Sequence, residues 1–288
     1  MKINTKPILV TGSHRSGSTW VGQMLSLPYN IKYVSEPFNP SYGLRKFKSW
    51  FVYINSNNEN NYRSEINKLL KFRGNYRFNL PALRYWSNLV WPFNKRVVVK
   101  DPIACFSSQW LSDNFDMEVI VLFRHPVAFY TSLKRLDWHF DFDNFLNQSD
   151  LMADHLGLFS DLIKKDNKSY AEEAAILWLC IYHVLDKYIT SHPDWIVKRH
   201  EDISTDPIKE FTEIYSKLNL PFTSKVNKKI IEYSSGKNTE PTKVLDLKRD
   251  SKTVVDQWSK HASSEEIKII KNITGDLALK YYPEDKWH

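Results

Sequence analysis

The chain begins with a pattern that strongly constrains its fold: a strand-like apolar run, a glycine-containing loop and a helix-like stretch. The run is Pro7–Val10, the loop contains Gly12 and Gly17, and the helical pattern begins at Ser18. A loop of this kind directs successive backbone N–H groups into one concavity, and the helix N-terminus adds partial positive charge. The pattern therefore predicts an anion-binding cradle at the edge of an α/β sheet.

This loop has the spacing of a phosphate-binding loop, or P-loop, with one departure. Gly12 and Gly17 are followed by the hydroxyl residue Thr19, but Ser18 stands where a nucleoside triphosphatase requires lysine. The cationic side chain is Arg15, inside the loop. A simple turn between a strand and a helix would also fit the two glycines, but the position directly after a buried-type strand favours the phosphate site.

Short β-type runs alternate with helical patterns along the chain, which predicts a largely parallel sheet with helices on both faces. The expected strands are Ile8–Thr11, Ile31–Ser35, Arg96–Lys100, Glu118–Arg124 and Trp195–Arg199. The expected helices are Thr19–Leu27, Phe106–Asn114, Pro126–Leu136, Lys168–Thr190, Pro207–Leu218, Lys225–Ser234, Thr253–Lys260 and Ser264–Tyr281. We therefore predict a single P-loop-like, three-layer α/β/α domain over residues 1–288.

Two long stretches interrupt this alternation. Residues 40–95 and 137–168 are rich in aromatic side chains, among them Trp50, Phe51 and Trp138. Insertions that follow the strands of an α/β sheet lie at its carboxyl edge, where ligands bind. We predict that both stretches form a cap over the ligand site. The alternative is a helical subdomain with a small core of its own.

Composition and charge narrow the choice of ligand without naming one. The chain has 40 Lys+Arg against 33 Asp+Glu, a formal net charge of +7, which favours an anionic ligand such as a nucleotide, a nucleic acid, a lipid or a polyanionic glycan. The two cysteines, Cys105 and Cys180, offer neither a disulfide framework nor metal-ligand spacing. No apolar run approaches the length of a membrane span and residues 1–6 do not form a signal peptide, so we expect a cytoplasmic protein.

A second anion-binding pattern follows the fourth expected strand. The strand ends at Arg124, Pro126 occupies the first turn of the next helix, and Ser132 lies eight residues after the arginine. A guanidinium and a hydroxyl can together hold one further phosphate. An arginine at a strand end is more often structural when it stands alone, but beside the first loop it predicts a second anion site on the same ligand.

Both patterns resemble those of the sulfotransferases that use 3′-phosphoadenosine 5′-phosphosulfate (PAPS). The loop Arg15-Ser16-Gly17-Ser18-Thr19 matches the segment that holds the 5′-phosphosulfate in that family. Arg124 and Ser132 match the pair that holds the 3′-phosphate, and Trp20 matches a position that packs near the adenine. The resemblance implies PAPS as the sulfuryl donor, no metal, and no nucleic-acid partner.

The matched segments extend from the first strand to about Trp258. The stretch from the loop through Glu36-Pro37 is most similar to the carbohydrate 6-O-sulfotransferases. Lys100-Asp101-Pro102 and Arg249-x-Ser251 are more similar to the tyrosylprotein sulfotransferases. The resemblance therefore implies transfer to an acceptor hydroxyl, on a carbohydrate or glycolipid that the predicted cap binds. A peptide tyrosine or a small alcohol is the alternative acceptor.

The implied chemistry is an in-line displacement in which the acceptor hydroxyl attacks sulfur and the nucleotide phosphate leaves. Glu36, at the end of the second strand, is the expected general base, and Asp101 is the reserve candidate. Arg15 is expected to meet the leaving phosphate, and Lys100 the bridging oxygen or the sulfuryl group. The simpler interpretation of Glu36 is a surface carboxylate or a helix-cap partner of Arg15.

The segment Lys248-Arg249-Asp250-Ser251 resembles the late loop that closes over PAPS. The resemblance implies that Arg249 reaches the 3′-phosphate and Ser251 the phosphosulfate, while a charged helix N-terminus explains the same residues equally well.

Two other functions remain open: a P-loop kinase or nucleoside triphosphatase, and a non-catalytic polyanion-binding protein. Ser18 at the lysine position weighs against the first, and the second does not need Glu36 or Lys100.

Overall fold

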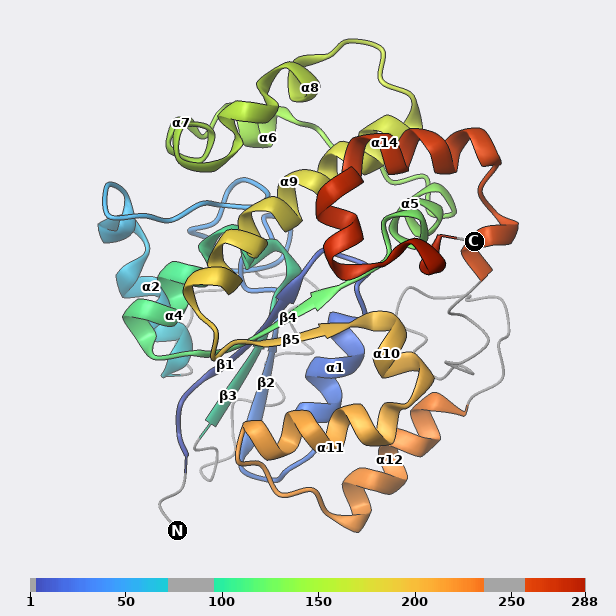
Figure 1. Ribbon diagram of the computed structural model, residues 1–288. Coiled ribbons are helices and arrows are strands. Elements are labelled where there is room, and N and C mark those ends of the chain that lie inside the picture. Colours follow the sequence, from blue (N-terminus) through green and yellow to red (C-terminus); the bar gives the residue numbers. More distant parts are fainter. Residues whose placement is uncertain (1–3, 72–95, 236–256, 288) are drawn as a thin grey trace.

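The computed structural model describes residues 4–71, 96–235 and 257–287. At its centre a parallel five-stranded sheet has the order β2-β3-β1-β4-β5 (Figure 1). The strands are β1 (Ile8–Gly12), β2 (Ile31–Ser35), β3 (Arg96–Lys100), β4 (Glu118–Phe123) and β5 (Ile196–Arg199). All five predicted strands are confirmed, because each observed end lies within one residue of the predicted one.

The central strand β1 pairs on both sides, with Ile8 opposite Val98 of β3 and Glu118 of β4. Parallel strands covered by helices on both faces are apolar along their whole length, which explains the uninterrupted apolar runs of the sequence. Successive side chains of a strand point to opposite faces. Leu9 accordingly packs in the core of one face and Val10 in the core of the other.

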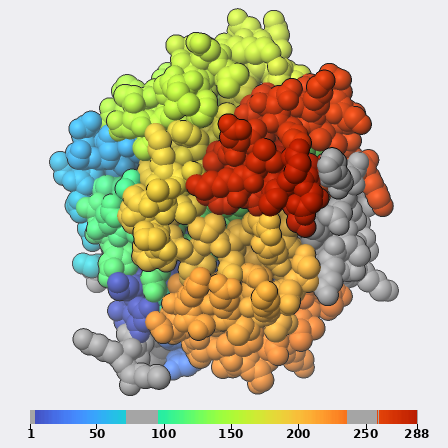
Figure 2. Space-filling view, in the orientation of Figure 1, coloured from blue at the N-terminus to red at the C-terminus, as the bar shows by residue number. Residues whose placement is uncertain are grey.

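Helices cover both faces of the sheet (Figure 1). One face carries α1 (Ser18–Leu25), α11 (Pro207–Lys217) and α12 (Ser224–Ser234). The opposite face carries α4 (Ser108–Phe115), α5 (Pro126–Lys134), α9 (Tyr170–Ser191) and α14 (Ser264–Tyr281). Figure 2 shows the last of these, in red, directly against α9, in yellow. The predicted three-layer α/β/α fold is therefore confirmed.

Two predicted helices differ from the observed ones. The helix expected at Phe106–Asn114 is preceded by a 3-10 helix, because the Asp101 side chain caps Pro102–Ser107 and α4 starts only at Ser108. Of the helix expected at Thr253–Lys260, residues 253–256 lie outside the described part, and Gln257–Lys260 is a 3-10 helix. The shorter elements are η1 (Glu59–Asn61), α2 (Arg63–Leu70), η2 (Pro102–Ser107), α6 (Asp143–Leu146), α7 (Ser149–Leu151), η3 (Met152–Leu156), η4 (Gly157–Phe159), α8 (Ser160–Lys164), α10 (His200–Thr205), η5 (Gln257–Lys260) and η6 (Glu284–Lys286).

The two insertions are described over residues 40–71 and 137–168, while residues 72–95 lie outside the described part. Their buried aromatic side chains, such as Phe51 and Phe145, pack in the same core as the sheet residue Val121. The insertions therefore have no separate core within the described ranges. Over residues 4–71, 96–235 and 257–287 together, no helix combines the length and the apolar character that crossing a bilayer requires.

Candidate active site at the carboxyl edge of the sheet

The loop between β1 and α1 requires glycine at two places. Gly12 has φ +140°, and a Cβ atom there would lie 2.2 Å from the backbone oxygen of Leu122 in β4. Gly17 has φ +85°, and its Cβ would lie 2.5 Å from Nδ1 of His200, the first residue of α10. Only glycine adopts such angles without strain, so both glycines hold the loop close to its neighbours.

Three predicted anion-binding residues converge beside this loop. Arg15 Nε donates a hydrogen bond of 3.0 Å to Ser132 Oγ in α5. Arg124, directly after β4, donates through its guanidinium to the backbone oxygen of Arg15. Residues more than a hundred positions apart in the sequence therefore form one cationic cluster. Burial lowers the pKa of Arg124, and the carboxylate of Glu201 opposes that shift.

Several polar atoms of the predicted donor site are buried without a hydrogen-bond partner among the described residues. They are Ser16 Oγ, Trp20 Nε1 and Arg124 Nε. An unsatisfied buried polar atom costs about 1–3 kcal/mol, so most such atoms in folded proteins have a partner. Arg124 also contacts the Arg15 backbone, so its Nε, which has no partner among the described residues, fits an anionic ligand such as phosphate.

Glu36 and Lys100 form an ion pair at neighbouring strand ends. Lys100 Nζ contacts Oε1 of Glu36, and the backbone N–H of Glu36 donates to the Lys100 carbonyl at 2.7 Å. Tyr42 OH and Asn39 Nδ2 both donate to Oε2 of the same carboxylate, the latter at 3.1 Å. Glu36 also has φ +49°, an uncommon left-handed angle for a residue with a side chain.

The electrostatics keep Glu36 ionised at neutral pH. Burial acts to raise the pKa of Glu36, but the positive charge of Lys100 and the hydrogen bonds from Lys100, Tyr42 and Asn39 outweigh it and lower the pKa below its usual value. The side chain is only partly buried, with 19% of its surface exposed, whereas Lys100 is 2% exposed. The carboxylate is therefore charged and accessible, as a proton acceptor must be.

Asp101, the reserve candidate, holds the local backbone. Its Oδ2 accepts from the backbone N–H of Phe38 at 2.7 Å, and Oδ1 from that of Ile103 at 2.9 Å. The residue is fully buried, and burial together with the charge of Glu36 raises its pKa to about 7. Both oxygens are thus engaged in fixing the turns after β2 and β3.

The two insertions meet the loop at His14 and Arg15. The His14 ring lies 5.0 Å from that of Phe129 in α5 and 6.0 Å from that of Phe51. Arg15 lies over the Trp138 ring at 5.7 Å, and Trp138 is 41% exposed. Burial, followed by the charge of Arg15, lowers the pKa of His14 to about 4, so that its imidazole is neutral at pH 7.

Two side chains that donate to Glu36 were not predicted from the sequence, and two predicted residues lie outside the described part. Asn39 and Tyr42 follow Glu36 closely in Glu-Pro-Phe-Asn-Pro-Ser-Tyr, and this concentration of turn-forming and polar residues was the available signal. Ser18 and Thr19 occupy the first turn of α1. Arg249 and Ser251 lie outside the described residues, so their predicted roles stay predictions.

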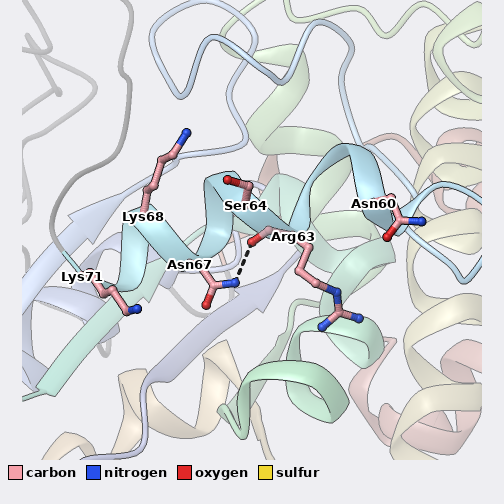
Figure 3. Close-up of a pocket in the computed structure, with 6 residues that line it drawn as sticks. All are labelled: Asn60, Arg63, Ser64, Asn67, Lys68 and Lys71. Atoms are coloured by element: carbon pink, nitrogen blue, oxygen red, sulfur yellow. Dashed lines mark hydrogen bonds between the residues drawn. The ribbon is translucent and has the colours of Figure 1, made fainter.

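A solvent-facing pocket of about 660 Å³ lies on α2, outside this cluster (Figure 3). Two of its cationic side chains are already paired, Arg63 with Glu59 at 2.5 Å and Lys68 with Glu65 at 2.7 Å. Its lining residues are Asn60, Arg63, Ser64, Asn67, Lys68 and Lys71. None of the predicted site residues within the described ranges lines this pocket.

No protein-family model and no curated protein matches the chain. Among solved structures, it is similar to the sulfotransferase domain from the curacin biosynthetic pathway, with 16% identity and a TM-score of 0.52 over 93% of this chain and 97% of that one. It is also similar to the sulfotransferase domain of a Synechococcus olefin synthase (17% identity, TM-score 0.46, 96% and 98% covered). A mouse sulfotransferase complexed with PAP gives 12% identity, a TM-score of 0.46, and coverage of 97% and 90%. The likeness to the curacin domain extends over nearly all of both chains, and it shows that this protein has the fold of the sulfotransferases.

Proposed function

We propose that this protein is a sulfotransferase that moves the sulfuryl group of PAPS to an acceptor hydroxyl. The observation that carries the proposal is the order of charged residues along the carboxyl edge of the sheet. Glu36 follows β2, Lys100 ends β3, Arg15 lies in the loop after β1, and Arg124 follows β4. A proton acceptor and cationic groups are thus arranged along one edge, as sulfuryl transfer between a nucleotide and a hydroxyl requires.

The donor is proposed to lie across the loop with its phosphates at the cationic cluster. The 5′-phosphosulfate is assigned to Arg15 and to the loop Ser16–Thr19, at the N-terminus of α1. The 3′-phosphate is assigned to Arg124 and Ser132. Arg124 Nε supports this assignment, since it is buried and has no hydrogen-bond partner in the described part of the chain. Trp20 is assigned to the adenine end, and Arg249 to the loop that closes the site.

In the proposed reaction, Glu36 accepts the proton of the acceptor hydroxyl. The hydroxyl oxygen forms a bond to sulfur while the bond from sulfur to the 5′-phosphate oxygen breaks, and that oxygen keeps the electron pair. Arg15 and Lys100 stabilise the charge that develops on the leaving phosphate and the sulfuryl oxygens. Ser251 is assigned to the phosphosulfate. Asp101 is not the proposed base, because it is fully buried, whereas the Glu36 side chain is 19% exposed.

The proposed acceptor is a carbohydrate or glycolipid. Trp50 and Trp138 are 37% and 41% exposed, and they belong to the two insertions that form the proposed acceptor-binding cap. Sugar rings stack on exposed aromatic faces of this kind. The proximity of Trp138 to Arg15 supports an acceptor that enters from the cap side of the loop.

Calorimetry with adenosine 3′,5′-bisphosphate (PAP) and Mg-ATP tests the donor assignment. We expect PAP to bind, and Arg124→Ala to weaken that binding about 10- to 100-fold, the loss of a charge-assisted contact. Ser132→Ala, a smaller change, should weaken it less. Arg63→Ala, on the remote α2 pocket, is the matched control and should leave PAP affinity unchanged.

An acceptor screen with labelled PAPS tests the reaction. Glu36→Gln should retain PAP affinity while the transfer rate falls about 10²- to 10⁴-fold, because a general base is lost. Preference for Mg-ATP over PAP would instead indicate a kinase. Salt-sensitive binding of a sulfated glycan, with no PAP binding and no turnover, would indicate a polyanion-binding protein.

A further inference from the structure

The loop after β2 folds back on the Glu36 carboxylate. Backbone hydrogen bonds tighten this turn. The Asn39 N–H donates to the backbone oxygen of Glu36 at 3.1 Å, and the Leu44 N–H donates to the backbone oxygen of Pro37 at 2.7 Å. Asn39 is itself 3% exposed. The turn thereby brings two side-chain donors, Asn39 Nδ2 and Tyr42 OH, to one carboxylate oxygen of Glu36.

The donors are divided unequally between the two oxygens. Among the described residues, Oε2 accepts from both Tyr42 and Asn39, while Oε1 accepts from Lys100 alone. An ionised carboxylate has about four lone-pair sites, two on each oxygen. Oε2 is therefore saturated, and the remaining site is on Oε1, beside the ammonium of Lys100.

We propose that Tyr42 and Asn39 are positioning residues that leave only the Oε1 atom of Glu36, beside Lys100, to take the acceptor's proton. This inference rests on the proposed sulfotransferase function. The hydroxyl oxygen that delivers a proton to Oε1 then lies next to Lys100 Nζ, the group assigned to the bridging and sulfuryl oxygens. The proton passes to Oε1, the oxygen bonds to sulfur, and the electron pair of the broken bond leaves with the nucleotide phosphate.

The same two donors stabilise the ionised form of Glu36. Among the described residues, the other titratable groups that act on this carboxylate, or feel its charge, are Lys100, Asp101, Tyr33 and His14. His14 is neutral at pH 7, and burial raises the pKa of Tyr33 so that it is neutral too. Hydrogen bonds to the charged form lower a pKa. Removing the Tyr42 hydroxyl must therefore raise the pKa of Glu36.

A titration followed by NMR measures this effect directly. The full-length protein is labelled with ¹³C at glutamate side-chain carboxyls, and the Glu36 resonance is identified by its absence in Glu36→Gln. Tyr42→Phe should raise the midpoint of the Glu36 titration by about one pH unit, the size expected for one hydrogen bond to a charged group. Asn39→Asp, which keeps the side-chain shape but replaces the donor with a carboxylate, should raise it at least as far.

Tyr33→Phe is the matched control, because the buried Tyr33 hydroxyl feels the charge of Glu36 but is not among the side chains that donate a hydrogen bond to its carboxylate. It should leave the Glu36 titration unchanged. An unchanged titration in both Tyr42→Phe and Asn39→Asp would overturn the proposal. Equal shifts in all three variants would also overturn it, because the effect would then be a general disturbance of the site.

Kinetics separate this inference from the proposed function. In Tyr42→Phe, we expect kcat to fall about tenfold with KM for PAPS unchanged, and the acid limb of kcat/KM to move upward with the NMR midpoint. If Glu36→Gln abolishes transfer but the Tyr42→Phe profile overlays that of the wild type, the positioning role fails and the sulfotransferase stands. If the wild type transfers no sulfuryl group to any acceptor, the function fails and the catalytic role of Oε1 fails with it.

Discussion

Replacing Gly17 with alanine tests the geometry of the anion-binding loop without assuming any ligand. Gly17 has φ +85°, where a residue with a Cβ costs about 1–2 kcal/mol relative to glycine. The new Cβ would also lie 2.5 Å from Nδ1 of His200. The imidazole must rotate away, and an off-rotamer side chain costs about 0.5–1.5 kcal/mol. We therefore expect Gly17→Ala to lower the free energy of unfolding by about 2–3 kcal/mol.

Urea denaturation followed by circular dichroism measures this loss. With a slope of about 3 kcal/mol per molar urea, the midpoint should fall by roughly 1 M. In a His200→Ala background, Gly17→Ala should lower the free energy of unfolding by about 1 kcal/mol less. The clash with the imidazole is then absent, and only the cost of the left-handed backbone angle remains. Gly12→Ala should cost more than Gly17→Ala, since its Cβ would meet the backbone oxygen of Leu122 at 2.2 Å, where no side chain can move away.

Two results would refute this reasoning. An unchanged midpoint in Gly17→Ala would show that the loop does not adopt the left-handed conformation at that residue. A cost that is the same with and without the imidazole would show that His200 does not lie against the loop. PAP calorimetry on the same variants would then tell whether the conformation of the loop or its contact with α10 controls binding.

Two further predictions concern the turn that carries Arg124. Burial, followed by the charge of Arg124, lowers the pKa of His125 to about 3 from 6.5, so the unfolded chain takes up a proton first as the pH falls. The stability that neutral His125 contributes is complete above pH 6.5 and is lost below it. His125→Asn should therefore reduce the loss of unfolding free energy between pH 7 and pH 5 by about 2 kcal/mol in urea titrations, and an equal loss in both proteins would contradict this. Trp258, 7% exposed, stacks on His125 with centroids 4.8 Å apart, so Trp258→Ala should lower stability by about 3–5 kcal/mol, with Trp258→Phe as the milder control in thermal unfolding.

The sheet could be predicted from the sequence because its strands are buried on both faces. Such strands appear as short, continuous apolar runs, and the ends of the runs mark the ends of the strands. The same reasoning placed Glu36, Lys100 and Arg124 at one edge, since the carboxyl ends of parallel strands meet there. Placing these residues at one edge requires only the direction of each strand, and the alternation of strands with helices indicates that the strands are parallel.

The contacts within the site could not be predicted in this way. The resemblance assigned Arg15 and Ser132 to different phosphates, yet Arg15 Nε bonds directly to Ser132 Oγ. The direction of the Arg15 side chain depends on its rotamer and on the left-handed backbone at this residue, φ +66°. Neither produces a periodic pattern in the sequence. Tyr42 and Asn39 were missed for the same reason, because their positions depend on how the turn after β2 closes.

The order of the strands in the sheet constrains the size of the ligand, and this order differs from the order along the sequence. Along the chain the charged residues follow as Arg15, Glu36, Lys100 and Arg124, whereas across the sheet the order is Glu36, Lys100, Arg15 and Arg124. Glu36 and Arg124 follow strands three spacings apart, about 14 Å at the usual distance of about 4.8 Å between strands. A single phosphate or sulfate cannot touch both ends of such an array. A ligand that does so must be extended. The proposed nucleotide donor meets this condition, with one anionic group at Arg124 and its reacting group near Lys100, whereas a simple anion reaches only part of the edge.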